Sequence, residues 1–283
     1  MDASRLRKRA LPKTSSTPRN RPGGGKGTVP AVVRATRLLD ALAHAKEPVP
    51  LSELTRQLNL PKSTVHGLCT TLVQAGLMTR FENGTYHLGL HIMDLAHAFL
   101  SRTDLTVQFA KLWDSLALLP EETIILSVLD GADVVYIACR NGSRPLGVSF
   151  RIGMRLPASC TASGKALLSS LSPERVGELM STAGLRPLTR KSVAGLQALQ
   201  RQLALARKRG YSVDDEETRD GMICFGAPVF DSSRDEAVAG VGVSLLKATV
   251  DQSQRALAAQ AVKQMAEALS KRMGAPMMSH PGP

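Results

Sequence analysis

Apolar residues recur at intervals of three and four positions near the start of the chain, and this spacing predicts an amphipathic helix. They are Ala31, Val32, Ala35, Leu38, Leu39 and Leu42. Pro48 and Pro50 are expected to end this helix. Ser52 is the predicted N-cap of a short second helix, in which Leu54 and Leu58 face the same way.

A third segment carries its apolar residues on one helical face. Val65, Leu68, Cys69 and Leu72 stand at positions i, i+3, i+4 and i+7. We expect this helix to begin at Pro61, after Asn59 has ended the short one, and to end at Gly76. Two extended runs then flank Asn83-Gly84, a strong indication of a two-residue hairpin loop. The order of helix, short helix, turn, helix and hairpin predicts a winged helix-turn-helix.

The segment LGLHIMDLAHAFLSR, residues 88–102, is amphipathic but too apolar to stand alone in water. We expect it to form a linker helix that packs on another chain or on both domains. From about residue 103 the pattern becomes α+β. A helix at 104–118 precedes two strands joined across Asp130-Gly131-Ala132-Asp133.

Further helices are expected to start near Thr161, Ser172 and Ser192, the last of them reaching Gly210. Strands around MICFGAPVFD and AVAGVGVSLL form a second hairpin across residues 231–236. A helix at about 250–273 closes the domain. The predicted class is therefore α+β with an antiparallel sheet.

The polar face of the helix at 61–76 contains no carboxylate, although the chain has 24 acidic residues. A helix that enters the DNA major groove needs short donors and acceptors, a positive N-terminus toward phosphate and no acid facing the backbone. We expect double-stranded DNA to be bound by Lys62, Ser63, Thr64, His66 and Thr70, with hairpin contacts from Arg80, Asn83, Thr85, Tyr86 and His87. The alternative is a plain helical subdomain whose polar face is neutral by chance.

The charge of the chain favours a polyanionic partner. Its 36 Lys and Arg residues against 24 Asp and Glu give a net charge of +12 and a pI near 10.0. Residues 1–29 hold eight of the basic residues and one acid, and they lack apolar periodicity. We predict a disordered tail there. It either keeps the protein in solution or touches DNA phosphates, and the sequence leaves both possibilities open.

The four cysteines are widely spaced and form no CxxC pair. Neither a disulfide scaffold nor a structural metal site is expected, and a reducing compartment fits this usage. No apolar stretch reaches membrane-spanning length, and no secretory signal is evident. We expect a cytoplasmic protein with no membrane partner and no cofactor.

Two separate blocks of the sequence resemble the IclR-type family of bacterial transcriptional regulators. The first is LSELTRQLNLPKSTVHGLCTTLVQAGLM with GTYHLG, and the second is RIGMRLPASCTASGKALLSSL with GYSVDDEETRDGMICFGAPVFD. The resemblance spans roughly residues 30–274. It implies a dimer or a dimer of dimers, in which a linker helix joins each DNA-binding domain to a GAF-like effector-binding domain. The predicted division is a tail at 1–29, a winged helix-turn-helix at 30–88, a linker helix at 89–102, an effector-binding domain at 103–274 and a flexible tail at 275–283.

One position departs from the family pattern. The family often has Arg where this chain has Gly67, within the expected DNA-contacting helix. Glycine there costs about 1 kcal/mol of helix stability relative to alanine and removes a side chain that could read a base. We therefore expect DNA binding to depend more on phosphate and shape contacts, with a steep salt dependence.

Polar residues in apolar company predict a small-ligand pocket in the second half of the chain. Thr161 begins a helix whose free amides can receive a carboxylate. The resemblance implies that the effector pocket is lined by Ala162, Ser163, Asp214, Met222, Cys224 and Ser244. Gly242 competes with Ser244, because the preceding hairpin is longer here. Lys165 is expected to be an exposed helix residue.

Two of these residues could have a purely structural role instead. Cys224 fits a small core residue in an apolar strand, and Asp214 fits a solvated acidic turn. A hydrolase that uses Cys224 or Ser163 as nucleophile is a further alternative. It would need a nearby base, yet residues 98–279 contain no histidine.

The preferred interpretation is a non-enzymatic, ligand-responsive regulator of a catabolic operon that senses a small organic acid. A ligand-independent architectural DNA binder remains the other alternative, although such a role has no need for about 170 residues beyond the linker.

Overall fold

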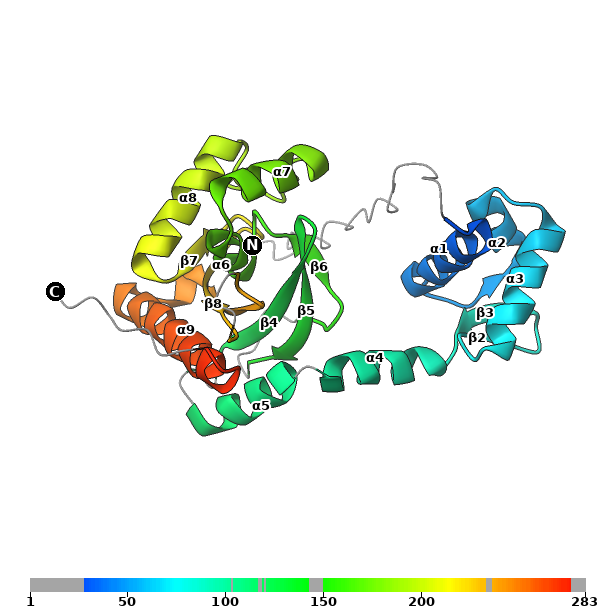
Figure 1. The fold of residues 1–283 in the computed structure, drawn as a ribbon, viewed down its shortest axis with the longest axis horizontal. Helices are drawn as coiled ribbons and strands as arrows, with labels where there is room; N and C mark the ends of the chain where they lie inside the picture. The colour runs from blue at the N-terminus through cyan, green and yellow to red at the C-terminus, as the bar shows by residue number, and fades with distance from the viewer. Residues whose placement is uncertain are drawn as a thin grey trace, which may run out of the picture. The chain divides into compact units, whose positions relative to one another are not determined.

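The computed structural model describes residues 28–102, 104–116, 119, 121–142, 150–232 and 236–275. The chain divides into two compact units, and the division falls between Leu95 and Ala96 (Figure 1). The predicted tails lie outside the described residues, apart from Thr28, Val29 and Ala275 at their inner ends.

The N-terminal unit is a helix-turn-helix followed by a small antiparallel sheet of order β1-β3-β2. Its elements are α1 (Pro30–His44), β1 (Val49–Pro50), α2 (Leu51–Leu58), α3 (Lys62–Gln74), β2 (Met78–Arg80), β3 (Thr85–Leu88) and the beginning of α4 (His91–Arg102). The core contains Leu38, Leu42, Leu54, Leu58, Val65, Cys69, Leu72, Met78 and Tyr86. The inward faces predicted for the first three helices are confirmed, except that Ala31 and Val32 are exposed.

Two local predictions in this unit are wrong. Ser52 is not an N-cap, because α2 begins one residue earlier and Pro50 occupies the cap position. The hairpin loop has three residues rather than two. Phe81 and Thr85 close it through a backbone hydrogen bond of 2.9 Å, and Gly84 takes the left-handed conformation with φ of 77°. This geometry matches a type I turn followed by a glycine bulge, so the hairpin uses only the glycine of Asn83-Gly84 in the left-handed region.

The C-terminal unit is built on a six-stranded antiparallel sheet of order β6-β5-β4-β9-β8-β7. Its strands are β4 (Thr123–Asp130), β5 (Asp133–Arg140), β6 (Arg155–Pro157), β7 (Ser212–Asp215), β8 (Met222–Val229) and β9 (Ala239–Leu246). The two predicted hairpins, β4-β5 and β8-β9, occupy the middle of the sheet. The edge strands β6 and β7 have three and four residues, too few to give an alternating pattern in the sequence.

Helices cover both faces of this sheet (Figure 1). They are α5 (Asp104–Leu116), α6 (Ala162–Ser170), α7 (Pro173–Ala183), α8 (Leu196–Arg209) and α9 (Gln252–Arg272), with a short 3-10 turn at Lys247–Thr249. One core lies between the sheet and α5 with α9, and a second lies between the sheet and α6, α7 and α8. The residues of β8 alternate between these cores, with Ile223 and Phe225 in the first and Met222 and Cys224 in the second.

Helix α6 lies unusually close to the sheet, because glycines face it. A Cβ atom at Gly226 would come within 2.4 Å of the Ala162 carbonyl carbon, and one at Gly240 within 2.6 Å of the Ser163 carbonyl oxygen. A third close contact involves Gly164, whose Cβ would lie 2.5 Å from the backbone of Ala158. Real Cβ atoms do not approach backbone this closely, so side chains here would push the helix off the sheet.

Two kinds of feature are absent from the described part of the chain. No helix there has the length and apolar character needed to cross a bilayer. The same residues contain no cluster of three or more His, Cys, Asp or Glu side chains placed to hold a metal ion.

Candidate DNA-binding helix and effector pocket

Helix α3 buries one stripe and exposes the rest. Val65, Cys69 and Leu72 are buried, whereas Lys62, Ser63, His66, Gly67 and Thr70 are exposed and Thr64 is partly buried. The exposed face includes no acid, as the sequence indicates. This face therefore offers an ammonium group, hydroxyls and an imidazole to a partner.

The N-terminus of α3 has no side-chain cap, since Pro61 occupies the cap position. The first amides of a helix lack intrahelical partners and carry the positive end of the helix dipole. Farther along, Thr70 donates its hydroxyl to the His66 carbonyl and Thr71 to the Gly67 carbonyl, each at 3.0 Å. These bonds hold the two hydroxyl groups against the helix, and each oxygen can still accept a hydrogen bond.

Gly67 lies in open space, because a Cβ atom there would meet nothing within 4 Å. Packing within the protein therefore does not demand glycine at this position. The exposed surface of α3 simply has no side chain in its middle.

The hairpin after α3 presents a smaller set of polar groups. Arg80 and Asn83 are exposed, and Asn83 accepts hydrogen bonds from the amide and hydroxyl of Thr85. Tyr86 is a correction to the sequence prediction, because its side chain belongs to the core and the residue is only 4% exposed. It pairs with Val49 and Arg80 across the small sheet and is not available to DNA. His87, the other aromatic residue expected to contact DNA, is exposed.

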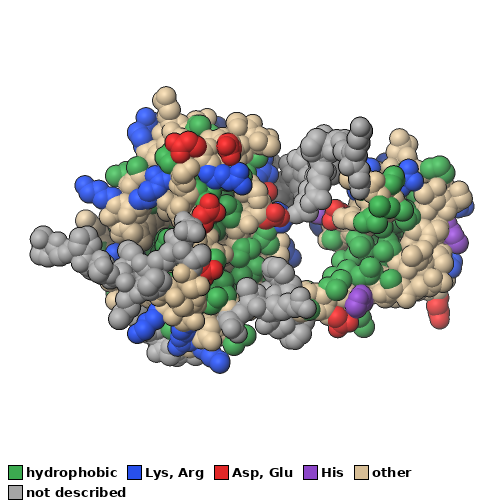
Figure 2. All heavy atoms as spheres, viewed as in Figure 1, with side chains coloured by type: hydrophobic (Ala, Val, Ile, Leu, Met, Phe, Trp, Pro, Cys, Tyr) green, Lys and Arg blue, Asp and Glu red, His purple; other side chains and the backbone are tan. Residues whose placement is uncertain are grey.

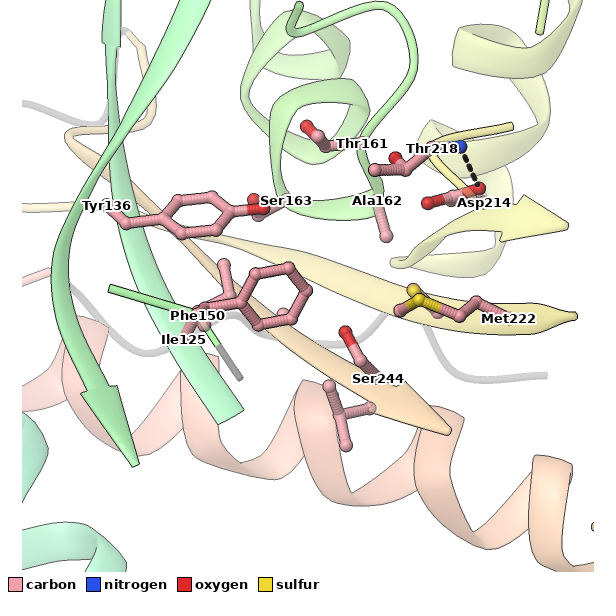
Figure 3. A pocket seen from close by; sticks show the side chains of 13 residues that line it. Ile125, Tyr136, Phe150, Thr161, Ala162, Ser163, Asp214, Thr218, Met222 and Ser244 are labelled. Atoms are coloured by element: carbon pink, nitrogen blue, oxygen red, sulfur yellow. Dashed lines mark hydrogen bonds between the residues drawn. The ribbon is translucent and has the colours of Figure 1, made fainter. Parts of the chain in front are cut away.

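A pocket in the C-terminal unit lies between the N-terminus of α6 and the face of the sheet (Figure 3). Its lining includes every residue predicted for the effector site, namely Thr161, Ala162, Ser163, Asp214, Met222, Cys224 and Ser244. Gly242, the competitor of Ser244, also lines it, so the two positions are not exclusive. The remaining lining residues, not predicted from the sequence, are Ile125, Tyr136, Phe150, Thr218 and Val243.

Strand register brings three of the polar residues into one row. Asp214 on β7 pairs with Cys224 on β8, and Cys224 pairs with Ser244 on β9. Directly opposed residues on neighbouring strands point to the same face of a sheet. Residues separated by up to 30 positions in the sequence thus form one polar strip under α6.

The α6 end of the pocket is held by hydroxyl groups. Thr161 caps α6 by accepting a hydrogen bond of 3.0 Å from the Gly164 amide. The Ser127 hydroxyl donates to Ser163 at 2.9 Å, and Ser212 donates to the Ala162 carbonyl. Thr161, Ser127 and Ser212 are all buried, so these hydrogen bonds fix the first turn of α6 relative to the sheet.

Asp214 organises the turn that follows β7. Its Oδ1 accepts hydrogen bonds from the amides of Glu217, at 2.7 Å, and Thr218, at 3.1 Å (Figure 3). Burial raises the pKa of the Asp214 carboxyl above its usual value, while the bonds from Thr218 and the charge of Lys165 act in the opposite direction. The interpretation of Asp214 as part of a solvated turn is wrong, because the residue is only 1% exposed.

Lys165 is a second correction, since it is 1% exposed rather than a surface residue. Its Nζ donates to Glu217 Oε1 at 2.6 Å and to Gln202 Oε1 at 2.8 Å. Burial raises the pKa of the Glu217 carboxyl, and the adjacent ammonium opposes that rise. The pair anchors the Asp214 turn to both α6 and α8.

Cys224 lacks the features of a catalytic thiol. Burial, followed by the proximity of Asp214, raises its pKa well above the ordinary value. Reactive cysteines have lowered pKa values and a nearby cation or histidine. No histidine occurs between residues 98 and 279, so neither Cys224 nor Ser163 has a general base of that kind.

The cavity itself is small. Its volume is about 20 Å³. A cavity needs about 10–15 Å³ to hold one water molecule. The cavity in this conformation thus has room for about one or two waters. A ligand of several heavy atoms requires its walls to move outward.

A winged helix-turn-helix joined to a sheet-based domain with a polar pocket defines a class of DNA-binding regulatory proteins. Two family models match this chain in succession. The IclR helix-turn-helix domain matches residues 31–80, and the bacterial transcriptional regulator IclR C-terminal domain matches residues 97–271. The chain belongs to the IclR family of DNA-binding transcriptional regulators.

Individual relatives agree with this assignment. The HTH-type transcriptional regulator XynR of Escherichia coli is 31% identical over 250 residues, which are 88% of this chain and 98% of XynR. The transcriptional repressor IclR of the same organism is 34% identical over 77% of this chain and 80% of its own. The crystal structure of the Agobacterium tumefaciens repressor BlcR is 42% identical, with a TM-score of 0.58 over 88% of this chain and 99% of that one. These relatives are regulators of transcription rather than enzymes.

Proposed function

We propose that this regulator binds operator DNA through α3 and the β2-β3 hairpin, and that a small organic acid in the α6 pocket changes its affinity for that DNA. The observation that carries the proposal is the exposed, acid-free face of α3. Lys62, Ser63 and His66 project from it next to an uncapped helix N-terminus. Such a surface suits a phosphate backbone and the edges of bases in a major groove.

The hairpin adds contacts at the side of that helix. Arg80 and Asn83 are exposed near its loop, and Thr85 is partly buried. Arg80 provides a phosphate contact, and the exposed His87 takes the place of the buried Tyr86. The absence of a side chain at Gly67 leaves fewer direct base contacts, so binding depends strongly on phosphates and on DNA shape.

Self-association completes the DNA-binding unit. Large apolar side chains are exposed on α1 and α4 and on the residues that precede them, among them Val32 at 62%, Leu90 at 84% and Met93 at 67%. Figure 2 shows hydrophobic side chains gathered on one face of the N-terminal unit. Exposed apolar patches of this kind mark protein interfaces. A second copy of the chain is the proposed occupant, which gives a dimer with two copies of α3.

The effector is held at the start of α6, with Asp214, Cys224 and Ser244 opposite. Its binding favours one arrangement of the C-terminal units, and α4 transmits the change along the chain. A coupling of about 1–3 kcal/mol changes DNA affinity by roughly 5- to 150-fold. A relative that is 34% identical over 77% of this chain is named the acetate operon repressor of Salmonella typhimurium, and we propose a catabolic operon as the target here.

Selection from a random duplex library by the full-length protein tests the DNA arm. We expect an approximately palindromic site with half-sites about 34 Å apart, one helical turn. Fluorescence anisotropy on that site, with and without short monocarboxylic acids, tests the effector arm. Enrichment of no sequence would refute the operator proposal, and an acid that binds without changing DNA affinity would refute the coupling.

A further inference from the structure

The ionisable side chains that line the α6 pocket are all acids. Among the described lining residues these are Tyr136, Asp214 and Cys224, and no Lys, Arg or His is with them. The nearest buried cation, Lys165, is committed to Glu217 and Gln202. An organic acid in this pocket therefore meets no free positive side chain, so its carboxylate depends on neutral donors.

Neutral donors gather at one end of the cavity. Tyr136 on β5 and Ser163 on α6 are 3% and 2% exposed, and Figure 3 shows the Tyr136 hydroxyl directed toward Ser163. Because Ser127 donates to the Ser163 oxygen, the Ser163 hydrogen is free to point into the cavity. Burial raises the pKa of the Tyr136 hydroxyl well above its ordinary value, so it stays a donor. The first amides of α6 add to this end.

The opposite end is an acceptor. Asp214 lies on β7, which is separated from β5 by the three strands β4, β9 and β8. Two backbone amides donate to its Oδ1, and we assign the ligand to the other carboxylate oxygen, Oδ2. The turn that carries it is fixed by the buried pair Lys165–Glu217 and by a hydrogen bond from the Thr218 hydroxyl to the Cys160 carbonyl. A carboxylate held this way repels a second carboxylate on a ligand. It accepts a charge-assisted hydrogen bond from a ligand hydroxyl.

We propose that the effector is a short hydroxy acid, whose carboxylate lies at the Tyr136 and Ser163 end and whose terminal hydroxyl donates to Asp214. This inference rests on the organic-acid effector proposed above and specifies its chemistry. Apolar side chains, among them Ile125, Phe150 and Met222, line the cavity between the two ends and suit a short methylene chain. The small cavity volume favours the shorter members of the class.

Isothermal titration of the full-length protein with matched acids tests the proposal. The probes are glycolate, 3-hydroxypropionate and 4-hydroxybutyrate, each paired with its deoxy analogue acetate, propionate or butyrate, together with malonate and succinate. For the best chain length, we expect the hydroxy acid to bind at least about tenfold more tightly than the deoxy acid, since the deoxy acid offers no donor to Oδ2 of the buried Asp214. The dicarboxylates should bind more weakly than either.

Two matched variants locate the effect. In Asp214→Asn the carbonyl oxygen takes the place of Oδ1 opposite the two backbone amides, so an NH2 group replaces the oxygen assigned to the ligand. This group cannot accept the ligand hydroxyl, so the hydroxyl preference should fall to about threefold or less. Asp215→Asn makes the same chemical change one residue along, at an exposed side chain paired with Lys247, and should keep the full preference. Binding of each variant to the selected DNA site confirms that it is folded.

The outcomes separate the two proposals. Equal binding of the hydroxy and deoxy acids, or an unchanged preference in Asp214→Asn, overturns the hydroxy-acid inference and leaves an organic-acid effector standing. Tighter binding of 4-aminobutyrate than of 4-hydroxybutyrate overturns it in favour of an amino acid. Failure of every acid to bind refutes the proposed effector class, and the inference with it.

Discussion

Helices α3 and α6 are built from similar residues and end up in opposite environments. Each begins after a non-helical residue, carries at least one hydroxyl side chain in its first turn and contains one lysine and one glycine. Lys62 and Gly67 of α3 are exposed, whereas Ala162 through Ser169 of α6 are all buried, including Lys165. The same residue types thus form an outward-facing surface in one unit and the wall of a cavity in the other.

The difference shows what controls exposure. Helix α3 has a single buried stripe, because it packs against its own unit on one side only. Helix α6 lies between the sheet and α8. The glycines of β8 and β9 have no side chain, so the α6 backbone can pack directly against the sheet. Polar groups in α6 must therefore find partners inside the protein, and Lys165 does so in Glu217 and Gln202.

The largest expected contrast is between the two lysines. Lys165→Met leaves the Glu217 carboxylate buried without its cation, which should lower the free energy of unfolding of the C-terminal unit by about 3–5 kcal/mol. Lys62→Met should leave stability almost unchanged. Hydrogen exchange measured separately for peptides of each unit reports both values. The double variant Lys165→Met/Glu217→Met should recover most of the loss, and no recovery would show that packing around Lys165, rather than charge, accounts for it.

The two helical glycines should respond with opposite signs, and Gly164 gives the larger change. Gly164→Ala places a Cβ atom 2.5 Å from the Ala158 backbone. We expect a loss of about 1–3 kcal/mol in the stability of the C-terminal unit, because α6 has to shift. Urea unfolding followed by hydrogen exchange in α6 measures it. A neutral result would mean that α6 can move off the sheet without cost.

Removal of the α3 ammonium group should act on DNA binding alone. Lys62→Ala is expected to weaken binding to all duplex sequences by a similar factor and to reduce the slope of log affinity against log salt by about 1. Anisotropy titrations at several salt concentrations give the slope. Lys208→Ala, at an exposed position in α8, is the charge-matched control and should leave the slope unchanged. Loss confined to one DNA sequence would assign Lys62 to a base instead.

The smallest expected effect is at Gly67, and it is favourable. Gly67→Ala adds a Cβ atom in open space and should stabilise the N-terminal unit by up to about 1 kcal/mol through helix propensity. Slower hydrogen exchange across α3 would show this gain. Faster exchange would mean that α3 has a backbone distortion at this position that only glycine allows.

The sequence predicts α3 well, because its apolar residues have the period of a helix with one buried face. It predicts the pocket residues through family resemblance, and the register that aligns Asp214, Cys224 and Ser244 is a property of the assembled sheet. The sequence predicts Lys165 and Tyr86 at the surface, because polar groups usually lie there. Their burial depends on partners distant in the sequence, Glu217 for one and the packing of Val49 and α1 for the other.

The glycines beneath α6 limit how this protein can acquire a new specificity. Gly226 and Gly240 face α6, and any larger residue at either position displaces the helix. Gly242, which lines the cavity, already has the smallest side chain possible. Space for a bulkier effector has to come from shorter side chains at other lining positions, of which Phe150 and Met222 are among the largest. Changes in ligand preference, whether by evolution or by redesign, therefore have to come from the side chains that line the cavity, because the glycines that face α6 cannot be replaced without moving the helix.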